Sequence, residues 1–83
     1  MRPEIYHAVQ QFEHEVQARY PNVKLELIEP RGGPDAAFRA TFSTSNWYDI
    51  WHQLHGIMMD IEEETGVWIS ILPKAPDSAP PAS

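Results

Sequence analysis

Cysteine is absent from the 83 residues of this chain. Without thiols the chain has no disulfide, no thiol nucleophile and no thiolate zinc ligand, so a metal site would depend on histidine and carboxylate side chains. The sequence also lacks a run approaching the roughly 20 apolar residues of a membrane-spanning helix, and its first residues lack the apolar run of a signal peptide. We therefore expect a soluble cytoplasmic protein with no membrane partner.

Basic residues are few: six lysines and arginines stand against twelve acidic residues, which gives a formal net charge of −6. The six basic residues are scattered along the sequence rather than clustered. Because nucleic-acid binding draws most of its affinity from basic side chains that neutralise phosphates, we expect no nucleic-acid partner. The charge balance favours a basic protein partner or a cation instead.

Recognisable catalytic patterns are also missing. The pair Gly32-Gly33 is followed by a strand pattern, whereas a phosphate-binding loop leads into a helix, so these glycines indicate a hairpin turn. No nucleophile with a neighbouring base and no pair of carboxylates can be placed on facing elements. We therefore expect no catalytic residues and a protein that is not an enzyme.

The hydrophobic content of 42% is sufficient for one compact core, so we expect a single α+β domain over residues 1–73. Apolar residues recur at helical spacing over residues 3–19, which predicts a first helix. Residues 23–28 and 37–43 alternate apolar and polar side chains, and the turn formers of residues 29–35 separate them. This arrangement predicts a β-hairpin.

A second helix is predicted to begin after Asn46, which together with Asp49 imitates a capping box, and to end at a left-handed Gly66. Residues 67–72 follow as a third strand, and residues 74–83 are rich in Pro, Ala and Ser and predict a disordered tail. The order helix, strand, strand, helix, strand predicts an αββαβ two-layer sandwich, in which a three-stranded sheet carries two helices on one face.

The second helix divides by angle into a broad apolar face, an acidic face and a narrow flank. The apolar face is expected to lie on the core and consists of Trp47, Ile50, Trp51, Leu54, Ile57, Met58 and Ile61. The flank consists of Tyr48, His52, His55 and Met59, at spacings of four, three and four. We expect this flank to bind a partner, unless it is only the amphipathic border of the helix, with apolar side-chain bodies packed under polar tips.

His52 and His55 are three residues apart, so both imidazoles can reach one ion from the same side of the helix. Glu62, or a residue of another element or subunit, would have to complete such a site. The sequence thus leaves open a divalent metal such as zinc as a cofactor. The acidic run of residues 62–64 at the helix end indicates either a surface for a basic partner or surface charge without a function.

Three strands with helices on one face leave the other face of the sheet open. By alternation that face carries Ile28, Trp68 and Leu72, and a cluster of these three would form an apolar patch of the kind that marks association. A homodimer through this face would also enlarge a small core. In the competing register Trp68 points inward and the β-branched residues that alternate with it are exposed.

The chain shares several features with a known family over about residues 4–73. Ser45 precedes the second helix and His52 follows seven positions later, the helix ends in acidic residues, and the last strand reads Ile69-Ser70-Ile71-Leu72-Pro73. In these features and in element order the chain resembles the cytoplasmic C-terminal, metallochaperone-like domain of cation diffusion facilitator transporters. The resemblance implies an αββαβ module that dimerises and binds divalent metal, with only His52 carried over as a ligand. Ser70 and Thr41 stand on strands where histidine would be needed, and no transmembrane half is present, so transport is not expected.

These features predict a small acidic protein-interaction module that is not an enzyme and that forms a homodimer. Its expected partner-binding residues are Tyr48, His52, His55, Met59, Ile28, Trp68 and Leu72. The alternative is a metal-binding regulatory domain that uses His52 and His55, with Glu62 as the third ligand.

Overall fold

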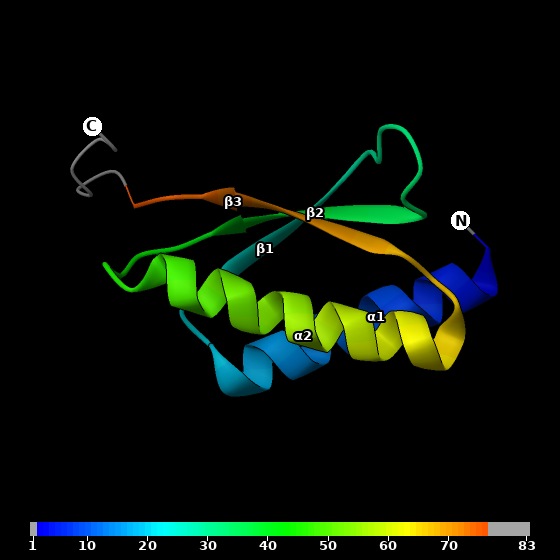
Figure 1. Cartoon of the computed structure of the whole chain (residues 1–83), viewed down its shortest axis with the longest axis horizontal. Helices are drawn as coiled ribbons and strands as arrows, with labels where there is room; N and C mark the ends of the chain where they lie inside the picture. The colour runs from blue at the N-terminus through cyan, green and yellow to red at the C-terminus, as the bar shows by residue number, and fades with distance from the viewer. Residues whose placement is uncertain (1, 77–83) are drawn as a thin grey trace.

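The computed structural model describes residues 2–76. In chain order these residues form α1 (Pro3–Arg19), β1 (Lys24–Ile28), β2 (Ala36–Thr41), α2 (Trp47–Thr65) and β3 (Ile69–Lys74). Both helices lie on the same side of a three-stranded sheet (Figure 1). The predicted fold class, an α+β sandwich of two layers with the order αββαβ, is confirmed.

The sheet is open and has the order β1-β2-β3, with β2 in the centre. β1 and β2 are antiparallel and form the predicted hairpin, in which Leu27 lies opposite Phe38. β3 runs parallel to β2, and Phe38 lies opposite Ile71. A parallel pair needs a crossover connection, which α2 supplies here. β1 and β3 are therefore the two edges of the sheet that residues 2–76 build.

The core lies between the helices and the sheet. α1 begins at Pro3, whose fixed φ suits a first helical position. The buried residues of α1 are Ile5, Ala8, Val9, Phe12 and Val16. The Phe12 ring meets the ring of Phe38 in β2 at a centroid distance of 5.3 Å. Burial of each such large apolar side chain contributes about 1.5–3 kcal/mol, so this stripe holds α1 against the sheet.

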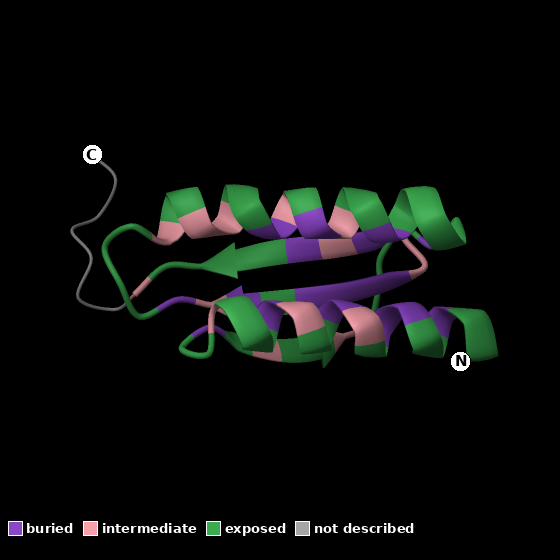
Figure 2. Ribbon diagram, turned by 90° about the horizontal axis from the view of Figure 1, so that it is seen from below, coloured by how far each residue is buried: buried purple, intermediate pink, exposed green. Residues whose placement is uncertain are grey.

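α2 turns its apolar side toward the same core, and Figure 2 shows the buried residues along the inner side of the helix. Leu54, Ile57 and Ile61 are buried, whereas the other predicted core residues of this helix are half-buried against the core. The indole Nε1–H of Trp51 donates a hydrogen bond to the carbonyl oxygen of Ile71 at 3.2 Å and so ties α2 to β3. Neither described helix is long and apolar enough to span a membrane.

The two ends of α2 are built differently. Gly66 is left-handed at φ 77°, and its N–H donates a hydrogen bond to the Glu62 carbonyl oxygen at 2.7 Å, so the predicted C-cap is confirmed. The predicted capping box is wrong, because the side chain of Asn46 makes no capping hydrogen bond. Its Oδ1 accepts a hydrogen bond from the Thr44 hydroxyl at 2.6 Å instead. A local side-chain partner thus competes with the helix N–H groups.

β3 begins and ends two residues later than the predicted strand and includes Pro73. Proline cannot donate to a ladder, so it is tolerated here because β3 lies at the edge of the described sheet. The Lys74 carbonyl oxygen accepts a hydrogen bond from the Phe42 N–H at 3.0 Å, so Lys74 belongs to the domain rather than to the predicted tail. From residue 77 onward the predicted tail lies outside the described residues.

Candidate functional site

The face of the sheet opposite the helices, here called the open face, carries the residues that alternation predicts. Rows across the strands are Ile28, Ala37 and Ser70, and then Glu26, Arg39 and Leu72. Trp68 is 43% exposed, whereas the β-branched residues that alternate with it in the sequence are buried. The competing register, with Trp68 in the core, is therefore wrong.

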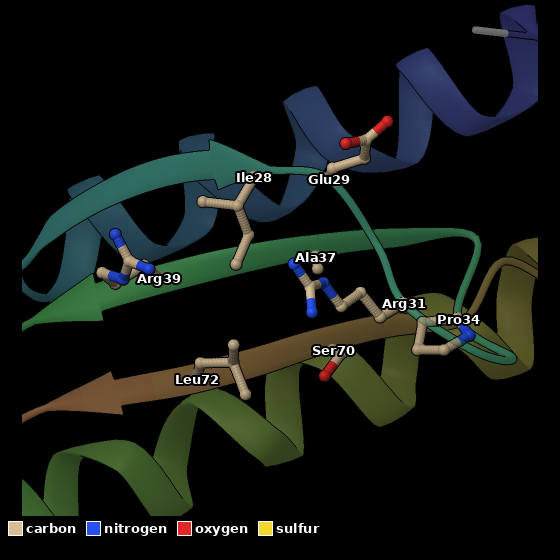
Figure 3. A pocket seen from close by; sticks show the side chains of 8 residues that line it. All are labelled: Ile28, Glu29, Arg31, Pro34, Ala37, Arg39, Ser70 and Leu72. Carbon is tan, nitrogen blue, oxygen red and sulfur yellow. The ribbon is translucent and has the colours of Figure 1, made fainter.

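A hollow of about 490 Å³ lies on the open face, and we call it the basin. It is lined by residues of all three strands and of the loop between β1 and β2: Ile28, Glu29, Arg31, Pro34, Ala37, Arg39, Ser70 and Leu72. Figure 3 shows the Arg31 side chain reaching from the loop over the centre of the sheet, beside Ala37. Ile28 and Leu72, two of the predicted association residues, line the basin, and Trp68 does not.

The loop between β1 and β2 rests against Trp68. Gly33 lies so close to the indole ring that an added Cβ would stand 2.7 Å from Cζ3 of Trp68. Gly32 has a φ of +86°, which glycine adopts without steric cost. Asp35 fixes the end of the loop, because its Oδ2 accepts a hydrogen bond from the Trp68 N–H at 3.0 Å. Its own N–H donates to the Trp68 carbonyl oxygen at 2.9 Å. The two glycines thus form the predicted turn, and the anchored loop brings Arg31 into the basin.

The two guanidinium groups of the basin differ in their partners. Nη1 of Arg39 lies 3.4 Å from Oε1 of Glu26 in an exposed ion pair, so part of its charge is already balanced. Arg31 forms no ion pair with any residue in the range 2–76. The basin thus offers the guanidinium of Arg31 and the hydroxyl of Ser70 as hydrogen-bond donors, and the carboxylate of Glu29 also lines it.

Charge is distributed unevenly between the two layers of the fold, although Glu26, Glu29 and Asp35 also lie on the open face or in its loop. Four of the six basic residues lie on the open face or at the loop above it: Lys24, Arg31, Arg39 and Lys74. The helices carry eight of the twelve acidic residues, three in α1 and five in α2. Basic residues that are scattered along the sequence thus gather on one face. Alternation predicts the positions of Lys24 and Arg39, but no sequence signal places a turn residue such as Arg31 over the sheet.

The predicted flank of α2 belongs to the helix layer and is separate from the basin. Tyr48 and Met59 are 54% and 62% exposed. The His52 ring packs edge-on against Tyr48 at a centroid distance of 4.7 Å, and the His55 ring packs against Trp51 at 4.5 Å. The structure therefore divides the predicted partner-binding residues between two layers rather than joining them in one site.

His52 and His55 lie side by side, with ring centroids 6.5 Å apart. Over the described range, no three histidine or acidic side chains gather into a group that would hold a metal ion, so Glu62 does not join the two histidines. Burial, and to a smaller extent the neighbouring His52, lower the pKa of His55 below its usual 6.5. A neutral imidazole is the form that binds metal. Metal binding therefore stays a prediction. Of its three predicted ligands, His52 and His55 lie side by side and Glu62 does not join them.

No protein-family model matches the chain, and neither a curated protein nor a solved structure matches it. The resemblance to the cation diffusion facilitator domain therefore stays a prediction.

Proposed function

We propose that the chain is a non-enzymatic protein-interaction module that binds an acidic segment of a partner protein in the basin. The basin itself carries the proposal. It places the guanidinium groups of Arg31 and Arg39 beside the apolar side chains of Ile28 and Leu72. A partner segment that alternates carboxylates with apolar side chains matches both features, because arginine binds carboxylates and the apolar residues lose contact with water.

The local charge supports an acidic partner although the whole chain is acidic. The two helices, which carry most of the acidic residues, lie on one side of the sheet (Figure 1), and the strand residues that line the basin point to the other side. The solvent-facing side of the helices is separated from the sheet, and so from the basin, by at least the helix diameter of about 10 Å. That distance exceeds the screening length of about 8 Å at physiological ionic strength. A ligand in the basin therefore responds mainly to the arginines and to the neighbouring glutamates.

The basin predicts moderate affinity. An exposed ion pair contributes about 0.2–1 kcal/mol, and buried apolar surface contributes about 25 cal/mol per Å². The cost of association offsets much of this gain, so we expect a Kd of about 1–100 μM for a short segment.

The open face is small for a homodimer that is held by side-chain packing alone, without the backbone hydrogen bonds that a strand pair adds. Strands about 4.8 Å apart and about 20 Å long give this three-stranded face a projected area of roughly 300 Å². A standard interface buries about 800 Å² on each partner. We therefore assign the open face to a partner segment rather than to the homodimer that the sequence predicts through it.

We also propose that the module acts in the cytoplasm and on proteins rather than on nucleic acids. The absence of cysteine fits a reducing compartment. The open face and its loop hold only four basic residues, and one of them is paired with Glu26. Nucleic-acid binding draws its affinity from many phosphate contacts, which this face does not offer.

Fluorescence polarisation with labelled peptides tests the proposed function. The probes are an eight-residue peptide that alternates Glu and Leu and its counterpart that alternates Lys and Leu. We expect saturable binding of the Glu-Leu peptide alone. Arg31→Gln should weaken that binding about five- to tenfold, because it removes a charged hydrogen-bond donor from the basin.

Arg19→Gln is the matched control, since it removes the same charge from α1, outside the basin. We expect it to change the affinity less than about twofold, because exposed charges beyond the screening length contribute little. Equal losses in the two variants, or equal binding of the two peptides, would contradict the proposed function.

A further inference from the structure

The outer side of β1 is a free strand edge. β1 pairs one residue to one with β2 over Lys24–Ile28, and no strand within residues 2–76 covers its other side. Leu27 faces the helix layer, opposite Phe38, and is 47% exposed. Such an edge presents unpaired backbone N–H and C=O groups together with apolar surface, which is the arrangement that pairs with another strand.

The two edges of the described sheet differ in their protection. β3 contains Pro73, which lacks a backbone donor and discourages strand addition. β1 contains no proline, and its unbroken register with β2 has no bulge. Its charged residues, Lys24 and Glu26, carry opposite signs and both lie on the open face. Two opposite charges spaced two residues apart can pair with the same two residues of an antiparallel, identical strand.

We propose that a second copy of this chain pairs with β1 as an antiparallel strand, with Leu25 of the two copies opposite each other. In this register Lys24 of each copy lies opposite Glu26 of the other, so two cross-strand pairs of opposite charge form on the open face. On the helix side, Leu27 of each copy lies opposite Val23 of the other, a residue that precedes β1 and is buried in its own copy. The second strand thus covers the free edge of β1.

Other registers lack this complementarity. A register centred on Glu26 places two glutamates opposite each other, and one centred on Lys24 does the same with two lysines, so both create like-charge pairs. A register centred on Leu27 sets Glu26 against Ile28 and leaves the lysine without a partner. Registers shifted by one residue set open-face residues against helix-facing ones and so place charge opposite leucine.

The resulting dimer has a continuous six-stranded sheet. Because the two-fold axis of an antiparallel edge pair is perpendicular to the sheet, all four helices lie on one face and both basins lie on the other. The interface uses only the β1 edge, so it leaves both basins open and does not depend on what they bind. A partner with two acidic segments would then gain from binding both basins of one dimer.

Sedimentation velocity over a concentration series tests the charge pairs. We expect the wild type to dimerise and Lys24→Glu and Glu26→Lys each to weaken the dimer about tenfold or more, because each change converts two attractive pairs into repulsive ones. The double variant Lys24→Glu with Glu26→Lys exchanges the charges and should restore the dimer. Glu26→Lys is its matched control, since both variants lose the contact with Arg39. A wild type that stays monomeric, or a double variant as weak as the single ones, would overturn the proposal.

Single cysteines test the register without relying on affinity. The chain has no native cysteine, so an introduced thiol has no other thiol of the chain to pair with. Residues directly opposite each other have Cα atoms about 4.5–5.5 Å apart, within disulfide range. We therefore expect Leu25→Cys to form a disulfide-linked dimer on mild oxidation. Leu27→Cys is the control, because the two Leu27 positions are offset by four residues, about 13 Å, and should not cross-link. Cross-linking at Leu27 in preference to Leu25 would contradict the register, and circular dichroism checks that both variants are folded.

Discussion

At the scale of single residues, the contact between Gly33 and Trp68 determines where the loop above the sheet lies. An added Cβ at Gly33 would stand 2.7 Å from the indole, whereas one at Gly32 would meet nothing within 4 Å but would require a φ of +86°. The two glycines are therefore needed for different reasons, one for space and one for conformation. The sequence predicts the turn from both glycines but cannot separate these roles, because the indole belongs to Trp68, which precedes β3 and lies more than thirty residues farther along the chain.

A double-mutant cycle separates the two roles. Gly33→Ala and Gly32→Ala should each destabilise the wild type by about 1 kcal/mol, the first through a clash and the second through backbone strain. In a Trp68→Ala background the cost of Gly33→Ala should largely disappear, while the cost of Gly32→Ala should persist. Urea denaturation measures both costs. Equal costs of Gly33→Ala in the two backgrounds would show that the indole contact is not what requires glycine there.

His55 makes stability depend on pH. Its pKa is lowered first by burial and then by His52, so the unfolded chain takes up this proton at a higher pH than the folded chain does. Stability is therefore lost as the pH falls from about 6.5 toward the lower pKa of the folded state. We expect His55→Gln to lose less thermal stability than the wild type between about pH 7.5 and pH 5.5.

His52→Gln serves as the control for the causes of this shift. It should retain most of the wild-type pH dependence, because burial, the larger cause, remains. Thermal melts followed by circular dichroism at the two pH values measure the differences. An unchanged pH dependence in His55→Gln would contradict the assignment to this histidine.

At the scale of elements, sequence periodicity predicts which segments form helices and strands. It does not predict where an element begins or ends when a single side-chain hydrogen bond or the position of a strand at the sheet edge determines that boundary. The apolar stripes of α1 and α2 and the alternation of β1 and β2 predict the elements, because burial of apolar faces dominates their stability. The N-terminal cap of α2 is not predicted, since Thr44 competes for the Asn46 side chain. The end of β3 is not predicted either, because proline is tolerated only once the strand is known to be an edge.

Gly56 gives a test of α2 as an element. It lies in the interior of the helix and is exposed, and a Cβ added there would meet nothing within 4 Å. Gly56→Ala should therefore stabilise the fold by about 0.5–1 kcal/mol through helix propensity alone. Asn46→Ala should cost less than the ~1 kcal/mol of a true N-cap, because its side chain does not cap. Urea denaturation measures both, and a destabilised Gly56→Ala would contradict the exposed position of Gly56.

At the scale of the whole molecule, the fold brings together basic residues that are scattered along the sequence. Acidic residues lie mostly on the helices, and four of the six basic residues lie on the open face or its loop. The alternation of the strands predicts the open face with Ile28 and Leu72, yet the basin itself depends on Arg31. Its position follows from a loop anchored by Trp68 and Asp35, a long-range contact that local sequence patterns do not encode.

The basin, and not the flank of α2, is the surface that we expect to bind an acidic partner segment. The direct measurement is a titration of the isotope-labelled chain with the Glu-Leu peptide, followed by amide and arginine side-chain NMR signals. We predict saturable shifts that are largest at Arg31, Arg39, Ser70 and Leu72 and that weaken with added salt, as screened ion pairs do. Shifts that are largest between Tyr48 and Met59, or an absence of saturable shifts, would contradict this assignment.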